Sequence, residues 1–280
     1  MNWGEPAGRG AGRSGGSGAL GEWWWRVAVT ARIGAAEHFA ENPWRISLTT
    51  MWPRALLQCL FFTMIGRVVG GEDGQAYTFV GSVAIIMTLF TLAQICDSPM
   101  RDRQSATFYR LRAGRLPVPV IYVIRAWPVV AEAVVLAAVC VVAIGLATGQ
   151  GELALQLLAL FPIDLLMALT SAAAGLTAAA AGLFGRAGSD IIVGNLGMYL
   201  IIAASGAMIP PGRVGWLDAI GTVVPMRHGI SATHDHLAGR PWLGDVLAEL
   251  AVGASWAIAG LAVYSWLTHR VRVTDHDKVS

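Results

Sequence analysis

Residues 76–95 read AYTFVGSVAIIMTLFTLAQI, a stretch without a single Asp, Glu, Lys or Arg. A helix needs about 20 predominantly apolar residues to cross the hydrocarbon core of a bilayer. The rest of the chain agrees, because 55% of its 280 residues are hydrophobic, only 14% are charged, and the mean hydropathy is +0.56. An ordinary soluble domain has about 25% charged residues. The sequence therefore predicts an all-α membrane protein and excludes a disordered, collagen-like or coiled-coil structure for the bulk of the chain.

Six stretches are long and apolar enough to be candidate membrane spans. They cover residues 48–69, 76–95, 118–147, 153–183, 191–209 and 246–267. The third is too long for one straight crossing, and the fourth is very rich in Ala and Gly. The sequence therefore predicts a domain of six transmembrane helices over residues 46–268, followed by a cytoplasmic tail over residues 269–280.

The N-terminal segment differs in composition from the spans. Residues 1–20 are rich in Gly, Ser and Arg, which predicts a disordered tail. Residues 21–45 predict an amphipathic helix, whose apolar stripe would consist of Trp24, Val27, Ala28, Ala31 and Ala35. Trp and Arg on one such helix suit the membrane interface. Asn42-Pro43 is expected to end this interfacial helix before the first span.

The distribution of basic residues predicts the orientation of the spans. Arg and Lys are concentrated in the N-terminal segment, the 97–116 connection and the C-terminal tail. The connections on the opposite side contain only Arg213, Arg227 and Arg240. Cytoplasmic connections carry the excess of Arg and Lys. We therefore expect both termini in the cytoplasm, which requires an even number of spans.

The 97–116 connection contains a predicted short amphipathic helix over residues 98–114. Ser98-Pro99 can start a helix, and Gly114 can end it. One face would carry Met100, Gln104, Thr107, Phe108 and Leu111, and most of the Arg residues would take the other face. The pattern fits a docking element for a cytosolic partner, and it fits equally a basic anchor on the inner membrane surface. Both interpretations stay open at this point.

The connection over residues 210–245 is predicted as an outer loop with a short apolar segment. Pro210-Pro211-Gly212 ends the fifth span, and residues 216–224 are too few to cross a bilayer. A short re-entrant or interfacial segment fits better, provided that protein buries its backbone. Within the fourth span, small residues at i, i+4 spacing over 171–182 indicate close helix packing. That packing face would lie within the chain, at a pathway or at a subunit interface.

Five polar side chains inside the predicted spans are candidates for a structural or functional role. They are Arg54, Gln58, Arg125, Glu132 and Asp164. Such groups are costly in lipid and usually face protein or a cavity. Three interpretations stay open: a structural ion pair, such as Arg54 with Glu132 or Asp164, a substrate pathway, and a proton relay.

The sequence argues against several other classes of function. The net charge of +2 gives no strong field for nucleic acid. Cys59, Cys96 and Cys140 are far apart and predict buried apolar positions rather than metal ligands. His234-Asp235-His236 predicts a solvated polar loop, because no third metal ligand is near in sequence. An intramembrane hydrolase would need a His within a span, and none of the six His residues lies in a predicted one.

Residues from about 40 to 270 resemble the membrane-spanning subunit of type-2 ABC exporters, a class that includes drug-efflux and polysaccharide-export permeases. Three features carry the resemblance, namely Asn42-Pro43-Trp44 leading to Pro53, Asp102-x-Gln104-x-x-Thr107, and Ser205-Gly206 followed by Pro210 and Pro225. The second feature stands where the family usually has Glu-x-Glu-x-Gly-Thr. Here Asp102 and Gln104 replace the glutamates, and Ala106 replaces the glycine.

The resemblance implies that the 98–114 helix is a coupling helix, seated in a cleft of a cytosolic ABC ATPase. Its contact residues would be Met100, Arg101, Asp102, Arg103, Gln104, Thr107, Phe108 and Leu111. No cofactor is expected in this chain, since ATP and Mg²⁺ would bind to the partner ATPase. One sequence feature supports this independently: a G-x-x-x-x-G-K-[ST] loop is impossible, because the only Lys is Lys278.

The resemblance also implies a second permease subunit, identical or diverged, that faces this chain across the substrate path in the lipid of the plasma membrane. The second and fifth spans hold few charges, which favours an amphipathic or lipophilic substrate (a drug, antibiotic, peptide or lipid-like molecule) moved out of the cell. The chain would be a transport subunit and not an enzyme. The alternatives are a non-transporting structural or sensor membrane protein, which would leave the 98–114 helix unexplained, and an intramembrane enzyme.

Overall fold

The computed structural model describes residues 17–104, 111, 116–182 and 189–276, and within these ranges the chain is helical with no strand. The elements in chain order are α1 (Ser17–Glu41), α2 (Trp44–Ile46), the π-helical turn η1 (Ser47–Met51), α3 (Trp52–Gln104), α5 (Val118–Arg125), α6 (Trp127–Thr148), α7 (Gly151–Ala159), α8 (Phe161–Gly182), α9 (Ser189–Ala204), α10 (Gly215–Gly221), α11 (Arg227–Leu237) and α12 (Leu243–His276). The all-α fold class is therefore confirmed for the described part of the chain.

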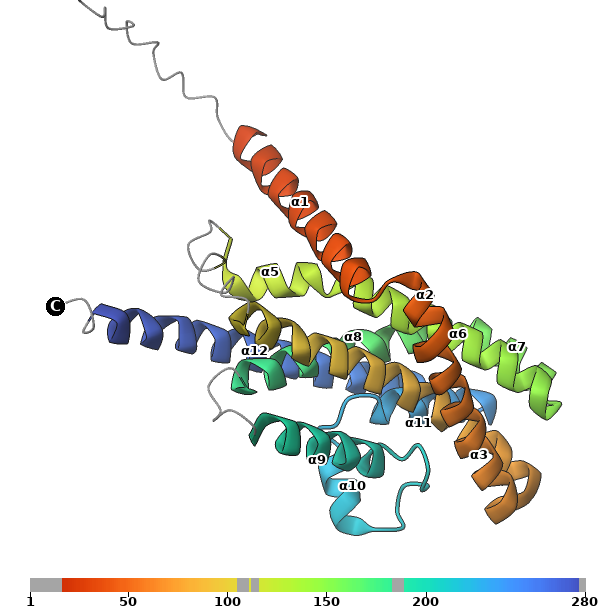
Figure 1. Ribbon diagram of the computed structural model, residues 1–280. Coiled ribbons are helices and arrows are strands. Elements are labelled where there is room, and N and C mark those ends of the chain that lie inside the picture. Colours follow the sequence, from red (N-terminus) through yellow and green to blue (C-terminus); the bar gives the residue numbers. More distant parts are fainter. Residues whose placement is uncertain (1–16, 105–110, 112–115, 183–188, 277–280) are drawn as a thin grey trace, which may run out of the picture.

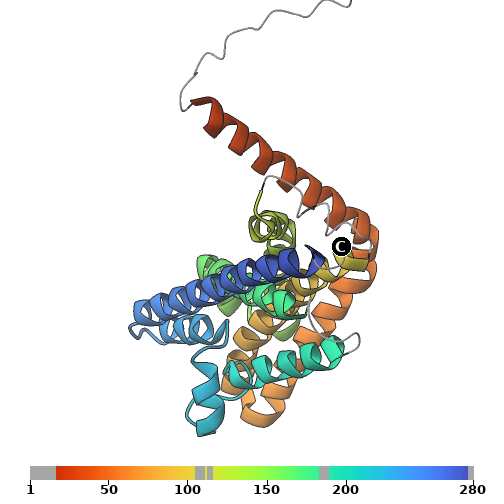
Figure 2. The same ribbon diagram turned by 90° about the vertical axis from the view of Figure 1, so that its left-hand side faces the viewer.

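Helix α1 lies next to α5 at one end of the bundle and extends away from it (Figures 1 and 2). It ends at Glu41, so the break predicted at Asn42-Pro43 is confirmed. The side of α1 that is buried differs from the predicted apolar stripe, because Gly34 and His38 are buried whereas Trp24 and Ala28 are exposed. The helix therefore binds the bundle through small and polar residues and leaves its tryptophans free to face lipid.

Helix α3 is a hairpin of two helical arms. Gly71 has φ 66° and ψ −146°, a conformation that glycine adopts readily and that reverses the chain between the first two predicted spans. The arms pack closely, with Cys59 Sγ 3.0 Å and Thr63 Oγ1 3.2 Å from Ser82 Oγ. Exposed apolar residues such as Val68 and Val69 then cover the outside of the hairpin.

Four helices of the described chain are long and apolar enough to cross a membrane. They cover Trp44–Pro99, Val118–Thr148, Phe161–Ala180 and Leu243–Trp266. The first contains both arms of α3, whereas α9, which occupies the fifth predicted span, has only 16 residues. At about 1.5 Å per residue that is shorter than the hydrocarbon core. The six-span arrangement therefore stays a prediction.

The third and fourth predicted spans are each divided. Helix α5 ends at Arg125, and α6 begins at Trp127 with Pro128 in its first turn, where a missing N–H costs nothing. After α6 the chain turns at Gly149, which has φ 75°. Helix α7 then packs back on α6, since a Cβ on Gly145 would lie 2.5 Å from Ala154 Cβ. The predicted fourth span is thus shared by α7 and α8, of which only α8 is long enough to cross a membrane.

Helix α8 lies between the second arm of α3 and α12. On one side Thr88 Oγ1 is 3.1 Å from Ser171 Oγ, and Cys96 Sγ donates to the Gly175 carbonyl at 3.4 Å. On the other side Thr177 donates to the Trp256 carbonyl at 2.8 Å. Residue numbers rise together on both sides, since Gly253 of α12 lies at Thr170 and Gly260 at Thr177, so the three segments run parallel. Ser171 and Gly175, two residues of the small-residue face predicted over 171–182, thus contact α3 of the same chain.

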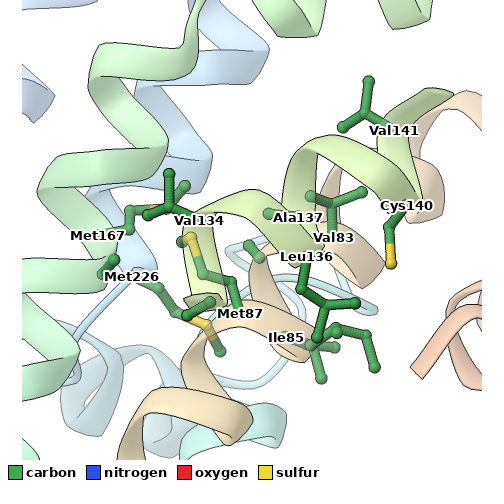
Figure 3. Packing of buried hydrophobic residues seen from close by; sticks show 14 of the residues in the cluster. Val83, Ile85, Met87, Val134, Leu136, Ala137, Cys140, Val141, Met167 and Met226 are labelled. Carbon is green, nitrogen blue, oxygen red and sulfur yellow. The ribbon is translucent and has the colours of Figure 1, made fainter. Parts of the chain in front are cut away.

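The apolar core fills the space between the second arm of α3, α6 and α8. Figure 3 shows Val83, Ile85 and Met87 of α3 packed against residues of α6 such as Leu136 and Ala137. Met167 of α8 and Met226, just before α11, complete this core on one side (Figure 3). The core thus connects the hairpin to the segment that follows α10.

The close contact between α8 and α12 leads to a prediction about stability. A Cβ on Gly253 would lie 2.8 Å from Thr170 Oγ1, whereas a Cβ on Gly244 of the same helix would meet nothing within 4 Å. We expect Gly253→Leu to lower the free energy of unfolding by about 1–3 kcal/mol through overpacking. Gly244→Leu should change it little. Thermal unfolding of the detergent-purified chain measures both, and equal midpoints for the two variants would contradict the packing described.

Candidate functional site

Arg125, the last residue of α5, joins three separate elements. Its guanidinium donates to Asp102 of α3 at 2.8 Å and forms an ion pair with Glu37 of α1. The hydroxyl of Tyr122 donates to the same carboxylate oxygen of Asp102 at 2.8 Å, and the guanidinium lies 5.6 Å from the Tyr122 ring centre. We call Glu37, Asp102, Tyr122 and Arg125 the Arg125 cluster.

The Arg125 cluster is shielded from water. The side chains of Arg125 and Asp102 are 11% and 8% exposed. Removing one member of an ion pair at such a site lowers stability strongly, because the remaining charge is left in a poorly solvated environment. The cluster is therefore expected to hold α1, α3 and α5 together rigidly rather than to behave like a surface salt bridge.

A second polar group joins α1 to α6. Glu132 lies 2.5 Å from His38 Nε2 and accepts a hydrogen bond from Trp52 Nε1 at 3.3 Å. The sequence suggested Arg54 as a partner of Glu132, and this is wrong for the described structure, where Arg54 is exposed. The reason is that Arg54 and Trp52 lie on different sides of α3, and only Trp52 faces α6.

A cavity of about 130 Å³ lies beside these groups. Its walls come from α1, the end of α3, α5, the start of α6 and α8, and its polar lining includes Glu41, Gln94, Ser98 and Arg101. Arg101 pairs with Glu41 at 2.7 Å, and Asn42 donates to Gln94 at 3.5 Å. A polar cavity of this size can hold water, which would solvate the polar groups of its lining.

The predicted coupling helix begins differently in the structure. Ser98-Pro99 was expected to start a helix, but α3 continues through Pro99 to Gln104, so this expectation is wrong. Pro99 removes only one N–H, and α3 accommodates the loss near its end. The predicted end at Gly114 lies outside the described residues.

The predicted contact residues fall into three groups. Asp102 is buried in the Arg125 cluster, and Leu111 packs against the apolar cluster of Val118, Tyr122, Ala180 and Tyr264. Arg101 pairs with Glu41 at the cavity. Thr107 and Phe108 lie outside the described residues, as do the side chains of Met100, Arg103 and Gln104. An ATPase contact of this segment stays a prediction, but Asp102 and Leu111 face the chain itself.

Two other polar residues of the predicted spans lie on α3 and α8. Gln58 and Asp164 are half-buried, with Asp164 in the first turn of α8. Of the five, only Arg125 and Glu132 have described partners on other helices, and both join the bundle to α1. The sequence pattern did not reveal Glu37 and His38 as their partners, because both lie outside the apolar stripe expected for α1.

The predicted outer loop contains two helices, α10 and α11, separated by a turn at Met226. The expectation that His234-Asp235-His236 forms a solvated loop is wrong, since these residues lie in α11. The His234 ring stacks on Tyr77 with centroids 4.3 Å apart, and the Tyr77 hydroxyl donates to the Gly206 carbonyl at 2.6 Å. Within the described residues no group of three His, Cys, Asp or Glu could hold a metal.

The environment of His234 predicts a pH dependence of stability. Burial lowers the pKa of His234 from 6.5 to about 4, although Asp235 opposes the shift. Between these values the unfolded chain binds a proton that the folded chain does not, so the free energy of unfolding falls as the pH falls. The slope from this one group is at most about 1.4 kcal/mol per pH unit.

His234→Phe tests this prediction, because Phe keeps the stack on Tyr77 and cannot bind a proton. Thermal unfolding in detergent at pH 7 and pH 5 should show a smaller loss of stability for the variant than for the unaltered chain. The same loss in both chains would mean that other groups cause the pH dependence.

The fold and the polar site define an integral membrane protein, a helical bundle whose N-terminal helix is bound to it by buried ion pairs. A family model described as ABC-2 type transporter matches residues 39–235. The chain belongs to the ABC-2 type transporter family and is a membrane permease of that class. The match includes the Arg125 cluster except for Glu37, as well as α10 and nearly all of α11. No curated protein matches the chain.

Proposed function

We propose that the chain is the membrane subunit of an ATP-driven exporter and that a separate cytosolic ABC ATPase binds ATP and Mg²⁺. The observation that carries the proposal is the position of the Arg125 cluster. Asp102 lies two residues before the end of α3, which leads into the proposed coupling segment, and its ion pair with Arg125 joins it to the third predicted span.

The proposed coupling step is mechanical. A displacement of the 98–114 segment by an ATPase would move the end of α3. The ion pairs from Asp102 to Arg125 and from Arg125 to Glu37 would carry the displacement to α5 and α1. Because buried ion pairs resist separation, these elements would move together. The cavity beside the cluster would supply the room for that movement.

The proposed orientation places this cluster on the cytoplasmic side of the plasma membrane, with six spans and both termini inside. The parallel course of the second arm of α3, α8 and α12 supports it, since these are the second, fourth and sixth predicted spans. All three would run from the outside to the cytoplasm.

The proposed substrate is amphipathic or lipophilic, and a second permease subunit would complete its path. The support is the apolar character of the spans, since exposed apolar residues cover the first arm of α3 and α12. A pathway lined by such faces would give no compensation for the desolvation of a highly charged substrate.

Gentle detergent extraction of the tagged chain from its native membrane tests the proposal. We expect a protein with a phosphate-binding loop of the Walker type to co-purify in a fixed ratio and to hydrolyse ATP. The chain purified alone should not hydrolyse ATP. Two results together would favour a non-transporting membrane protein. The chain would be recovered without such a partner, and membranes that lack the chain would hydrolyse ATP at the same rate as membranes that contain it.

A further inference from the structure

Glu249 of α12 is a fully buried acidic residue, with 0% exposure, at a distance from the Arg125 cluster. One carboxylate oxygen accepts a hydrogen bond from the backbone N–H of Met226 at 2.9 Å. The other accepts from the N–H of Gly229 at 3.1 Å. Both donors belong to the start of α11, so a carboxylate from one helix caps the N-terminus of another.

This arrangement gives each oxygen of the buried carboxylate a backbone donor. The first N–H groups of a helix have no partner within the helix, and the helix dipole favours a negative charge at this end. An isolated carboxylate buried in an apolar environment would be very costly. Glu249 therefore accepts hydrogen bonds from N–H groups that have no partner within α11, and these N–H groups in turn provide donors for the buried carboxylate.

The start of α11 also fits closely against the bundle. Met226 has φ 69° and is fully buried, and it joins Met167 and Met87 on one side of the core (Figure 3). A Cβ on Gly229 would lie 2.3 Å from Met167 Cγ, so only glycine allows this approach. We call Glu249, Met226, Gly229 and Met167 the α11 seat.

Arg227 extends these contacts to two more helices. Its guanidinium donates to the carbonyl of Ala204 at the end of α9 at 2.8 Å, and to Asp218 of α10 at 2.7 Å. Asp218 in turn accepts from the Gly212 N–H at 2.8 Å. The end of α9, α10 and α11 are thus held together by Arg227 and fixed to α12 and α8 by the α11 seat.

We infer that Glu249 is a positioning residue for transport, which holds the end of α9, α10 and α11 as one unit that closes the bundle opposite the Arg125 cluster. This inference rests on the proposed function, because only a transport cycle requires that end to open. Release of the two Glu249 hydrogen bonds loosens this unit, which Tyr77 of α3 also contacts through His234 and the Gly206 carbonyl, while the helices of the core stay packed.

Cysteine labelling in open membrane fragments tests the inference, because there a membrane-impermeant maleimide reaches both faces. Ala232→Cys reports on the seat, since Ala232 lies on α11 and is fully buried. Ala137→Cys on α6, equally buried, reports on the core. The chain without an added cysteine gives the background from its native cysteines. Each reporter is combined with Glu249→Gln, or with Glu152→Gln on an exposed position of α7 as the matched control.

We expect Glu249→Gln to accelerate labelling at position 232 about tenfold or more, the effect of weakening two hydrogen bonds to a charged acceptor. Glu152→Gln should leave it unchanged, and position 137 should stay protected in all chains. With Glu249 intact, ATP and orthovanadate should accelerate labelling at position 232. In Glu249→Gln, where the unit is already released, they should add little.

Three results would contradict either the inference about Glu249 or the proposed function. Unchanged labelling at position 232 in Glu249→Gln overturns the inference. Labelling of positions 232 and 137 together overturns it as well, because Glu249 would then support the whole fold. Faster labelling in Glu249→Gln with no response to nucleotide in any chain keeps the closing role of Glu249 and contradicts the proposed ATP-driven function.

Discussion

Arg125→Leu is expected to lower the free energy of unfolding by about 3–5 kcal/mol, the usual loss when one member of a buried ion pair is removed. The substitution removes the cation that faces the Asp102 carboxylate, whose side chain is only 8% exposed. Glu37 is 43% exposed and can turn to water, so the loss arises mainly at Asp102. Equilibrium unfolding of the detergent-purified chain measures the change.

Two further variants make this prediction specific. Arg67→Leu removes an exposed Arg of α3 and should change stability by little. The double variant Arg125→Leu with Asp102→Asn removes both charges and keeps an acceptor for the Tyr122 hydroxyl, so it should recover most of the lost stability. If the double variant is less stable than Arg125→Leu alone, Asp102 and Arg125 do not act as a pair.

The same double variant separates stability from coupling. The direct connection between α3 and α5 through Asp102 and Arg125 would be absent although the fold is restored. In the complex with an ATPase, we expect ATP hydrolysis to continue and its stimulation by substrate to be lost. Full stimulation in the double variant would show that displacement of the coupling segment reaches α5 by another route.

Much of the bundle could be predicted from the sequence, because its signals are local. Asn42-Pro43 breaks the chain where α1 ends, since the residue before a proline is driven out of the helical region. The long apolar stretch over 118–147, expected to be too long for one straight crossing, divides between Arg125 and Trp127. Composition and periodicity are sufficient for features of this kind.

The partners of the polar residues could not be predicted in the same way. Arg125 meets Asp102 and Glu37 only because α1 and the end of α3 converge on α5, and no spacing in the sequence encodes that convergence. The helix that contains His234 could not be predicted for a similar reason. Its N-terminus is stabilised by Glu249 from α12, which is distant in sequence, so the local residues look like a polar loop.

Asp102 also illustrates how a resemblance can assign a residue to the wrong environment. A contact face on a docked helix was expected to include both Asp102 and Leu111. In the structure the first is buried by Arg125 and Tyr122, and the second packs against the apolar cluster that contains Tyr264. The proposed ATPase contact therefore depends on the remaining residues of the 98–114 segment.

Phe108→Asp gives the second large expected effect and tests that contact directly. A buried Phe contributes on the order of 2 kcal/mol, and a charge placed in an apolar cleft of a partner is costly. We expect the variant to insert into membranes at the level of the unaltered chain, whereas ATPase co-purification or substrate-stimulated ATP hydrolysis falls about tenfold or more.

Leu111→Asp is the matched comparison, because it places the same charge three residues further along the same segment, where the side chain packs against the apolar cluster of Val118, Tyr122, Ala180 and Tyr264. This variant is expected to lower the yield and thermal stability of the isolated chain, since the charge enters the chain's own apolar cluster. The two substitutions should thus separate a partner contact from an internal one. Normal assembly and ATP hydrolysis in Phe108→Asp would show that the segment does not couple through this residue, and loss of stability in both variants would mean that Phe108, like Leu111, belongs to the fold.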